Sequence, residues 1–156
     1  MSAAELSVTS SPTSARSITR HVVTGVWVVA GAMLLSSAML RWTESGIGSQ
    51  LGGLELADNI RAGVLSPSWG VWVAVALYSI IACGGGCIAT AIGDHLAVVA
   101  ARGVVSIAGL LVFVAIARSA IPVTDWALGS TLAALSFLIA TTLTVVQLAL
   151  HFGSRS

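Results

Sequence analysis

Four apolar stretches, separated by short polar segments, make up most of this 156-residue chain. Their expected bounds are about 21–40, 69–92, 96–118 and 125–150, with Thr124 as a helix cap before the last. A helix rises about 1.5 Å per residue, so each stretch can cross a hydrocarbon core roughly 30 Å thick. The sequence therefore predicts an all-α, polytopic membrane protein with four transmembrane helices in a bundle.

The composition excludes several classes of protein. Hydrophobic residues make up 56% of the chain and charged residues 8%, whereas a soluble domain holds about 25% charged residues. The net charge of +1 gives no basic surface for nucleic acid. Two cysteines are too few for a disulfide-stapled domain. The predicted surroundings are therefore the lipid bilayer.

The domain organisation follows from the apolar stretches. Residues 1–17 are rich in Ser, Thr and Ala and predict a disordered cytoplasmic tail. Residues 18–152 form the predicted transmembrane domain, and 153–156 a short second tail. The first stretch, preceded by Arg16 and Arg20, also fits a signal peptide. Its length exceeds the usual apolar region of about 7–15 residues, which favours a retained span.

Arginine bias predicts the orientation, because cytoplasmic segments of membrane proteins carry more cations. With the N-terminus inside, the cytoplasmic side holds four arginines, Arg16, Arg20, Arg102 and Arg155. The other side holds three, Arg41, Arg61 and Arg118. We expect a multi-pass protein of the inner (cytoplasmic) membrane with both termini in the cytoplasm.

Two further patterns concern the membrane boundaries. Trp42, Trp69 and Trp126 fall at one face and predict an interfacial aromatic belt. Arg102 is the one charge placed within an apolar stretch. It either extends outward to the headgroups or lies buried, where it would bind an anion or a lipid headgroup. Its position close to the end of the stretch favours the first alternative.

The loop 41–68 is the only sizeable segment outside the predicted spans. Its tip, 43–49, is rich in Gly and Ser and is expected to be flexible, and an amphipathic helix is expected at about 51–62. This helix either covers the bundle as a connector or serves as a docking surface for a partner. The residues that would bind such a partner are Leu54, Ala57, Asp58, Ile60 and Arg61.

The segment Cys83-Gly-Gly-Gly-Cys87 admits two interpretations. The thiols, with His95, are weak candidates for a metal site or a redox pair. Small residues at i,i+4 spacing also let membrane helices approach closely, and this interpretation is favoured. The predicted helix-packing positions are Ser79, Ala82, Cys83, Gly86, Cys87, Gly129 and Ala133. No metal or cofactor is predicted.

No motif for catalysis stands out, and every carboxylate falls in a tail, a loop or the end of a span. We therefore expect a non-enzymatic accessory, scaffold or assembly protein that binds another membrane protein or itself. The first alternative is a small oligomeric transporter or channel lined by span-four hydroxyls such as Thr141 and Thr144. The second is a metal- or haem-binding redox protein.

Overall fold

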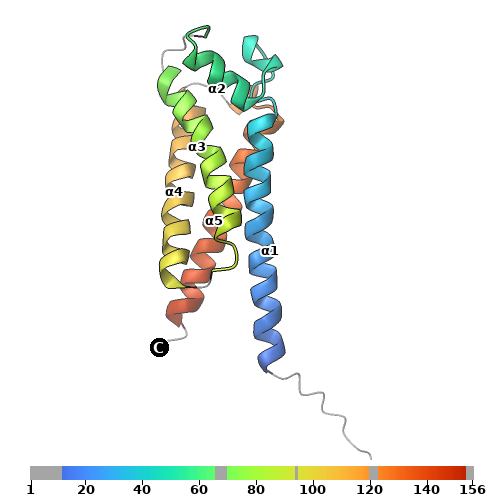
Figure 1. The fold of residues 1–156 in the computed structure, drawn as a ribbon, viewed down its shortest axis with the longest axis vertical. Helices are drawn as coiled ribbons and strands as arrows, with labels where there is room; N and C mark the ends of the chain where they lie inside the picture. The colour runs from blue at the N-terminus through green and yellow to red at the C-terminus, as the bar shows by residue number, and fades with distance from the viewer. Residues whose placement is uncertain (1–11, 66–69, 94, 120–122, 154–156) are drawn as a thin grey trace, which may run out of the picture.

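The computed structural model describes residues 12–65, 70–93, 95–119 and 123–153, and within them the fold is all-α (Figure 1). It has four long helices, α1 (Pro12–Met39), α3 (Gly70–Ala89), α4 (Leu96–Ser119) and α5 (Leu128–Gly153). A short helix, α2 (Gly53–Arg61), and two 3-10 turns, η1 (Ile47–Gln50) and η2 (Val123–Asp125), lie in the connections. The four long helices are long and apolar enough to span a membrane. The chain is a multi-pass membrane protein in contact with the bilayer.

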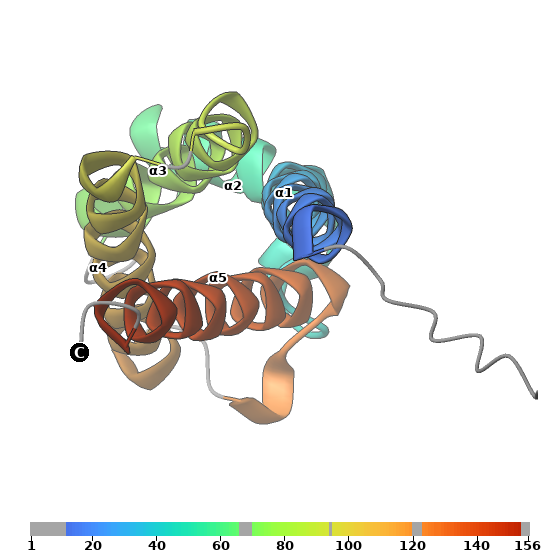
Figure 2. The same cartoon turned by 90° about the horizontal axis from the view of Figure 1, so that it is seen from below.

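The four spans form a ring in the order α1, α3, α4 and α5 (Figure 2). One end of the bundle, here named the cap end, carries α2 and both 3-10 turns. The other, the terminal end, holds the start of α1, the end of α5 and the turn between α3 and α4. Helix α1 packs extensively on α3 and α5, and α4 packs on α5. The pair α3–α4 has the least extensive contact among these neighbours.

Two helices begin at positions that differ from the sequence-based expectation. Helix α1 begins at Pro12, before the expected start near residue 21, because proline fits the first turn of a helix. Helix α5 begins at Leu128, so the expectation of a cap at Thr124 is wrong. The carbonyl of Ala127 accepts the Thr131 N–H instead, while Thr124 lies within η2.

Helices α1 and α3 cross in direct backbone contact at Gly31 and Gly84. A Cβ atom added to Gly31 would lie 2.7 Å from the Gly84 carbonyl oxygen, and one added to Gly84 would lie 2.9 Å from the Gly31 oxygen. Real Cβ atoms do not approach a backbone oxygen this closely, so only glycine fits on either side. The pair sets how near the two spans can come.

At the cap end, the carbonyls of the two residues that follow α1 accept hydrogen bonds from neighbouring segments. The amide of Gly53 donates to Leu40 O at 3.1 Å, and that of Gly129 donates to Arg41 O at 2.7 Å. A Cβ atom on Gly129 would meet the same Arg41 oxygen at 2.6 Å. The cap thus completes the hydrogen bonding that the end of a helix leaves open.

Trp42 lies at the centre of the cap and is only 1% exposed. Its Nε1 donates to Ser37 O at 2.8 Å, and its ring packs at 6.1 Å from that of Phe113. The prediction that Trp42 belongs to an interfacial belt is therefore wrong, because the cap folds over it. Trp126 also packs against Phe113, with 5.2 Å between the ring centroids, and Trp69 lies outside the described residues.

Helix α2 is amphipathic, as expected, and its apolar side covers α3. Leu56, Ala57 and Ile60 are buried in the same core as residues of α3, and Tyr78 Oη of α3 donates to the Asp58 carboxylate. The tip 43–49, expected to be flexible, makes contacts with η2. The amide of Glu44 donates to Asp125 O at 3.0 Å. These contacts hold the first loop against the bundle.

Candidate binding site between α3 and α4

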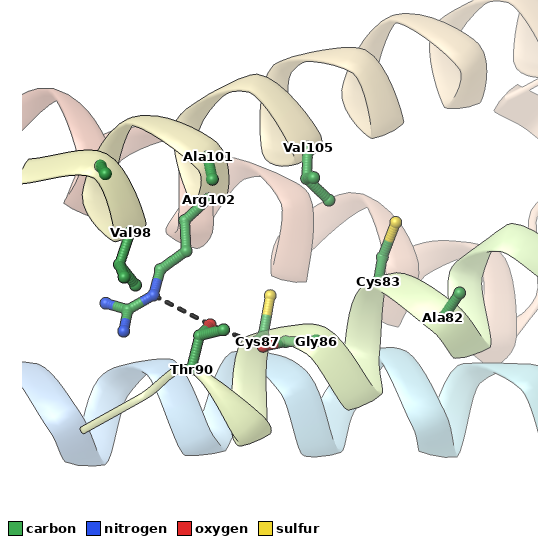
Figure 3. Close-up of a pocket in the computed structure, with 10 residues that line it drawn as sticks. Ala82, Cys83, Gly86, Cys87, Thr90, Val98, Ala101, Arg102 and Val105 are labelled. Atoms are coloured by element: carbon green, nitrogen blue, oxygen red, sulfur yellow. Dashed lines mark hydrogen bonds between the residues drawn. The ribbon is translucent and has the colours of Figure 1, made fainter. Parts of the chain in front are cut away.

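A cavity of about 470 Å³ lies between α3 and α4, in the half of the bundle nearer the terminal end (Figure 3). One wall consists of Ala82, Cys83, Gly86 and Cys87 of α3, with Thr90 directly after the end of this helix. Its α4 wall consists of Ala97, Val98, Ala101, Arg102 and Val105. Small residues on both walls leave the space, because their side chains are too short to fill the gap between two helix backbones.

The cavity opens on the side of the bundle that faces lipid. Ala82 and Gly86 on α3, and Ala97 and Ala101 on α4, are all exposed on the surface of the chain. A Cβ atom added to Gly86 would meet nothing within 4 Å. These four residues, named here the rim, border the opening. The surface around it belongs to membrane-spanning segments, so the opening faces the bilayer.

Arg102 lies in the wall of this cavity and is only 4% exposed. Its Nε donates to Thr90 Oγ1 at 3.0 Å, and its Nη2 donates to Gly93 O at 3.0 Å. The side chain therefore points back from α4 toward the α3–α4 turn. The prediction that Arg102 extends outward to the headgroups is wrong in that the side chain is buried inside the bundle. The guanidinium does point toward the end of the span, because its acceptors, Thr90 and Gly93, lie there.

The guanidinium of Arg102 also lies over the ring of Trp27, which is fully buried, with 5.0 Å between Cζ and the ring centroid. Trp27 Nε1 in turn donates to Gln147 Oε1 at 3.2 Å. Trp27 of α1 and the turn that follows α3 thus contact the guanidinium, and Gln147 of α5 contacts Trp27. Hydrogen bonds and ring contacts of this kind offset the cost of placing a charge inside a membrane domain.

Cys83 and Cys87 are free thiols that lie one turn apart on α3. In Figure 3 both side chains point from α3 toward α4. Cys87 is buried and Cys83 is partly exposed. His95, the third weak metal candidate, is exposed at the start of α4. Among the described residues, no group of three or more His, Cys, Asp or Glu side chains is placed to hold a metal ion.

The predicted helix-packing positions divide into two groups. Cys87, Gly129 and Ala133 are buried inside the chain. Ser79, Ala82 and Gly86 are exposed and Cys83 is partly exposed, and Ala82 and Gly86 belong to the rim. The second group is exposed on the surface of the described residues, so it can pack against another molecule.

The predicted partner-binding residues of α2 also divide. Ala57 and Ile60 are buried against the bundle, because the apolar side of α2 turns inward. Asp58 and Arg61 are exposed, and Leu54 is partly exposed. Only these three can reach a partner at the cap end.

The hydroxyls of the fourth span serve mainly in packing. Ser136 Oγ donates to Ala30 O of α1 at 2.5 Å, and Thr144 Oγ1 donates to Ala140 O at 2.9 Å. Both side chains are buried. Thr141 Oγ1, and Ser106 Oγ of the neighbouring helix α4, are buried with no hydrogen-bond partner among the described residues. These groups lie inside the bundle, whereas Thr131 and Thr142 of α5 are exposed.

The cluster around Arg102 could not be predicted from the sequence. The charge itself is conspicuous in an apolar stretch, but Trp27 and Gln147 lie far from it along the chain, at separations that no periodicity connects. Gly31 and Gly84 likewise lie on different helices, and no spacing in the sequence connects them. The signal that could have located the cavity is the pair of small-residue spacings, Ala82 with Gly86 and Ala97 with Ala101.

The fold and the site define a class: a four-span membrane protein with a buried arginine beside a cavity that opens to lipid. Comparison with protein-family models, with curated proteins and with solved structures finds no match to this chain. Its function is therefore argued from the site alone.

Proposed function

We propose that this chain is a non-catalytic accessory protein that binds another membrane protein, and that a transmembrane helix of the partner packs on the α3–α4 rim. The observation that carries the proposal is the rim itself. Ala82 with Gly86, and Ala97 with Ala101, place small residues one turn apart on two neighbouring helices, all exposed. Membrane helices associate where small residues let their backbones approach.

The packing of the other helix pairs supports this location. Gly31 and Gly84 bring α1 and α3 into close contact. The buried hydroxyl of Ser136 connects α5 to α1 by donating to Ala30 O. Gly109 of α4 receives the ring of Phe137 from α5, which a Cβ atom would meet at 2.3 Å. Only the α3–α4 side leaves its small residues without such a counterpart among the described residues.

The arrangement of hydroxyls favours this function over transport through a pore lined by the fourth span. Ser136 and Thr144 are buried and donate to backbone carbonyls. A pore shared between copies of the chain would need such groups on an exposed face of α5. Thr131 and Thr142 are exposed on that face, but large apolar residues, among them Leu135, Leu138 and Val145, occupy most of it.

Photo-crosslinking in intact cells tests the proposal. A photoreactive amino acid placed at Ala82 or Ala97 should give a protein adduct of one defined mass, whose partner mass spectrometry identifies. The same amino acid at Leu138, which is exposed on α5, provides the matched control and should give no such adduct. Equal adducts from all three positions, or none from Ala82 and Ala97, would show that the rim is not the interface.

The proposal includes a location in the cytoplasmic membrane with the terminal end facing the cytoplasm. Arginine bias supports this orientation, since Arg20 and Arg102 lie in the terminal half. In a background that lacks Cys83 and Cys87, Glu44→Cys at the cap end should react with a membrane-impermeant maleimide in intact cells. Thr19→Cys should react only after lysis. The reverse pattern would invert the orientation without affecting the proposed interface.

A further inference from the structure

We propose that Cys83 and Cys87 bind one mercuric ion, Hg(II), between their two sulfur atoms on the side of α3 that faces α4. This goes beyond the proposed function, because the site belongs to the isolated chain and needs no partner helix on the rim. The evidence is the spacing of the two thiols, the open space in front of them, the number of ligands and the charge that a membrane domain tolerates.

The spacing of the two thiols suits an ion between them better than a disulfide. Cys83 and Cys87 are free and lie one turn apart within α3. Residues at this spacing have their Cβ atoms about 5–6 Å apart, whereas a disulfide needs roughly 3.5–4.5 Å. A metal–thiolate bond is about 2.3 Å long, so a linear S–metal–S unit joins sulfur atoms about 4.6 Å apart. A regular helix therefore favours a bridging ion.

The two thiols also have open space in front of them. Figure 3 shows both sulfur atoms directed from α3 toward α4, and both residues line the cavity of about 470 Å³. Across the cavity lie Ala101 and Val105 of α4. A thiol pair enclosed by close packing would leave no room for an ion, whereas this pair borders a space that can hold one.

The number of ligands limits which ion suits the site. Of the residues that line the cavity, two carry a thiol, imidazole or carboxylate group, namely Cys83 and Cys87. Zinc prefers four such ligands in a tetrahedral arrangement. Thiolates are soft ligands that bind soft ions. The pair therefore suits a soft ion that two ligands satisfy, and Cu(I) and Hg(II) are ions of this kind.

The charge of the complex decides between these two ions. The cavity lies between two membrane-spanning helices, where a net charge is costly. Cu(I) with two thiolates carries one negative charge, whereas Hg(II) with two thiolates is neutral. The neutral complex requires no counter-charge, so Arg102 keeps its own contacts and takes no part. Mercuric chloride is also uncharged, so it can reach an opening that faces lipid.

Binding is an exchange of ligands without a change of oxidation state. Two Hg–Cl bonds and two S–H bonds break, and two Hg–S bonds form. Two protons and two chloride ions leave, as expected when thiols become metal ligands. The chain therefore gains the mass of one mercury atom and loses that of two hydrogen atoms.

Native mass spectrometry of the purified full chain in mild detergent tests the proposal. Mercuric chloride is the probe, and an excess of reduced glutathione competes for it. We expect the unmodified chain to retain one mercury. Cys83→Ser and Cys87→Ser should each retain it roughly 100-fold less well, because a single thiol lacks a second ligand held close by. Zinc chloride should give no retained adduct at the same concentration.

A matched variant keeps two thiols but changes their spacing. Cys83→Ala combined with Gly85→Cys places the thiols two residues apart, where they do not face each other. A Cβ atom on Gly85 would meet nothing within 4 Å, so the new side chain fits the fold. This double variant should retain mercury no better than Cys83→Ser.

A second pair of variants leaves both thiols in place and tests the cavity. Ala101 lines the cavity, whereas its neighbour Ala100 is exposed and is not among the lining residues. Ala101→Leu reduces the space in front of the thiols and should slow the uptake of mercury roughly fivefold. Ala100→Leu should leave the rate unchanged.

Three results would overturn the proposal. The first is retention by the unmodified chain that is no better than that of the single-serine variants. The second is equal retention by the double variant with altered spacing, which would indicate adventitious binding to any two thiols. The third is equal uptake by Ala101→Leu and Ala100→Leu, which would place the mercury outside the cavity. The photo-crosslinking result is independent of all three, because the purified chain contains no partner.

Discussion

The guanidinium of Arg102 lies 5.0 Å from the ring centroid of Trp27, and the two side chains come from helices that are far apart in the sequence. Arg102 also donates to Thr90 and Gly93, and Trp27 donates to Gln147. A network centred on Arg102 therefore joins α1, α4, α5 and the turn between α3 and α4 at the terminal end. A buried charge is costly unless surrounding groups compensate it, so this cluster is expected to determine how the spans assemble.

We predict that Trp27→Leu destabilises the bundle. The substitution removes the ring beneath Arg102 and the donor to Gln147, and it leaves a cavity in the core. We expect the free energy of unfolding to fall by about 2–4 kcal/mol. Trp27→Phe, which keeps a ring but loses the N–H group, should cost roughly half as much. Equilibrium unfolding in mixed micelles measures both values.

Trp72 provides the matched control, because it is 72% exposed on α3. Trp72→Leu should change the free energy of unfolding by no more than about 0.5 kcal/mol. If Trp27→Leu and Trp72→Leu had equal effects, the cluster around Arg102 would not stabilise the bundle.

Adjacent glycines on α3 give a second prediction. Gly84 faces the backbone of Gly31, whereas a Cβ atom on Gly85 would meet nothing within 4 Å. Gly84→Leu should force α1 and α3 apart and cost about 1–3 kcal/mol or more. Gly85→Leu should be neutral or slightly stabilising, because leucine favours a helix more than glycine does. Thermal unfolding of the two variants in the same detergent distinguishes them.

The four spans could be predicted from the sequence because the bilayer requires long apolar helices, and the length of each stretch reveals them. The amphipathic helix in the first loop could be predicted for a similar reason, since Ala57 and Ile60 recur at helical spacing. Burial of these two residues against α3 confirms that this side faces inward. The spacing of apolar residues within one helix is enough to predict its buried side, because this spacing does not depend on how the rest of the chain folds.

The site required information that periodicity does not contain. Trp42 stands at the end of a span, where an interfacial tryptophan is the usual expectation. It is buried because Gly53 and Gly129 bring the cap over it through contacts with the end of α1. Arg102 likewise points inward because Thr90, Gly93 and Trp27 converge there from other segments. Such contacts depend on which helices become neighbours, and one sequence alone does not specify that.

The cap helix gives a third prediction. Tyr78 Oη donates to the carboxylate of Asp58 and connects α2 to α3. Tyr78→Phe should loosen α2, so that amides such as that of Ala62, which donates to Asp58 O, exchange hydrogen roughly two- to fivefold faster. Glu55→Gln, an exposed change on the same helix, is the control. Equal exchange rates in the two variants would show that the tyrosine does not hold the cap.

The two thiols of α3 allow the cavity to be probed without any engineered cysteine. Cys83 is partly exposed in the cavity, and Cys87 is buried more deeply. A small lipid-soluble maleimide should therefore label Cys83 faster than Cys87 in intact membranes, while a charged maleimide should label neither. Ala101→Leu should slow the labelling of Cys83, because it fills the space in front of the thiol, and Ala100→Leu should not. Mass spectrometry of the labelled peptides measures each rate. Rapid labelling of Cys83 by the charged reagent would mean that the cavity opens to water rather than to lipid, since such a reagent does not enter hydrocarbon.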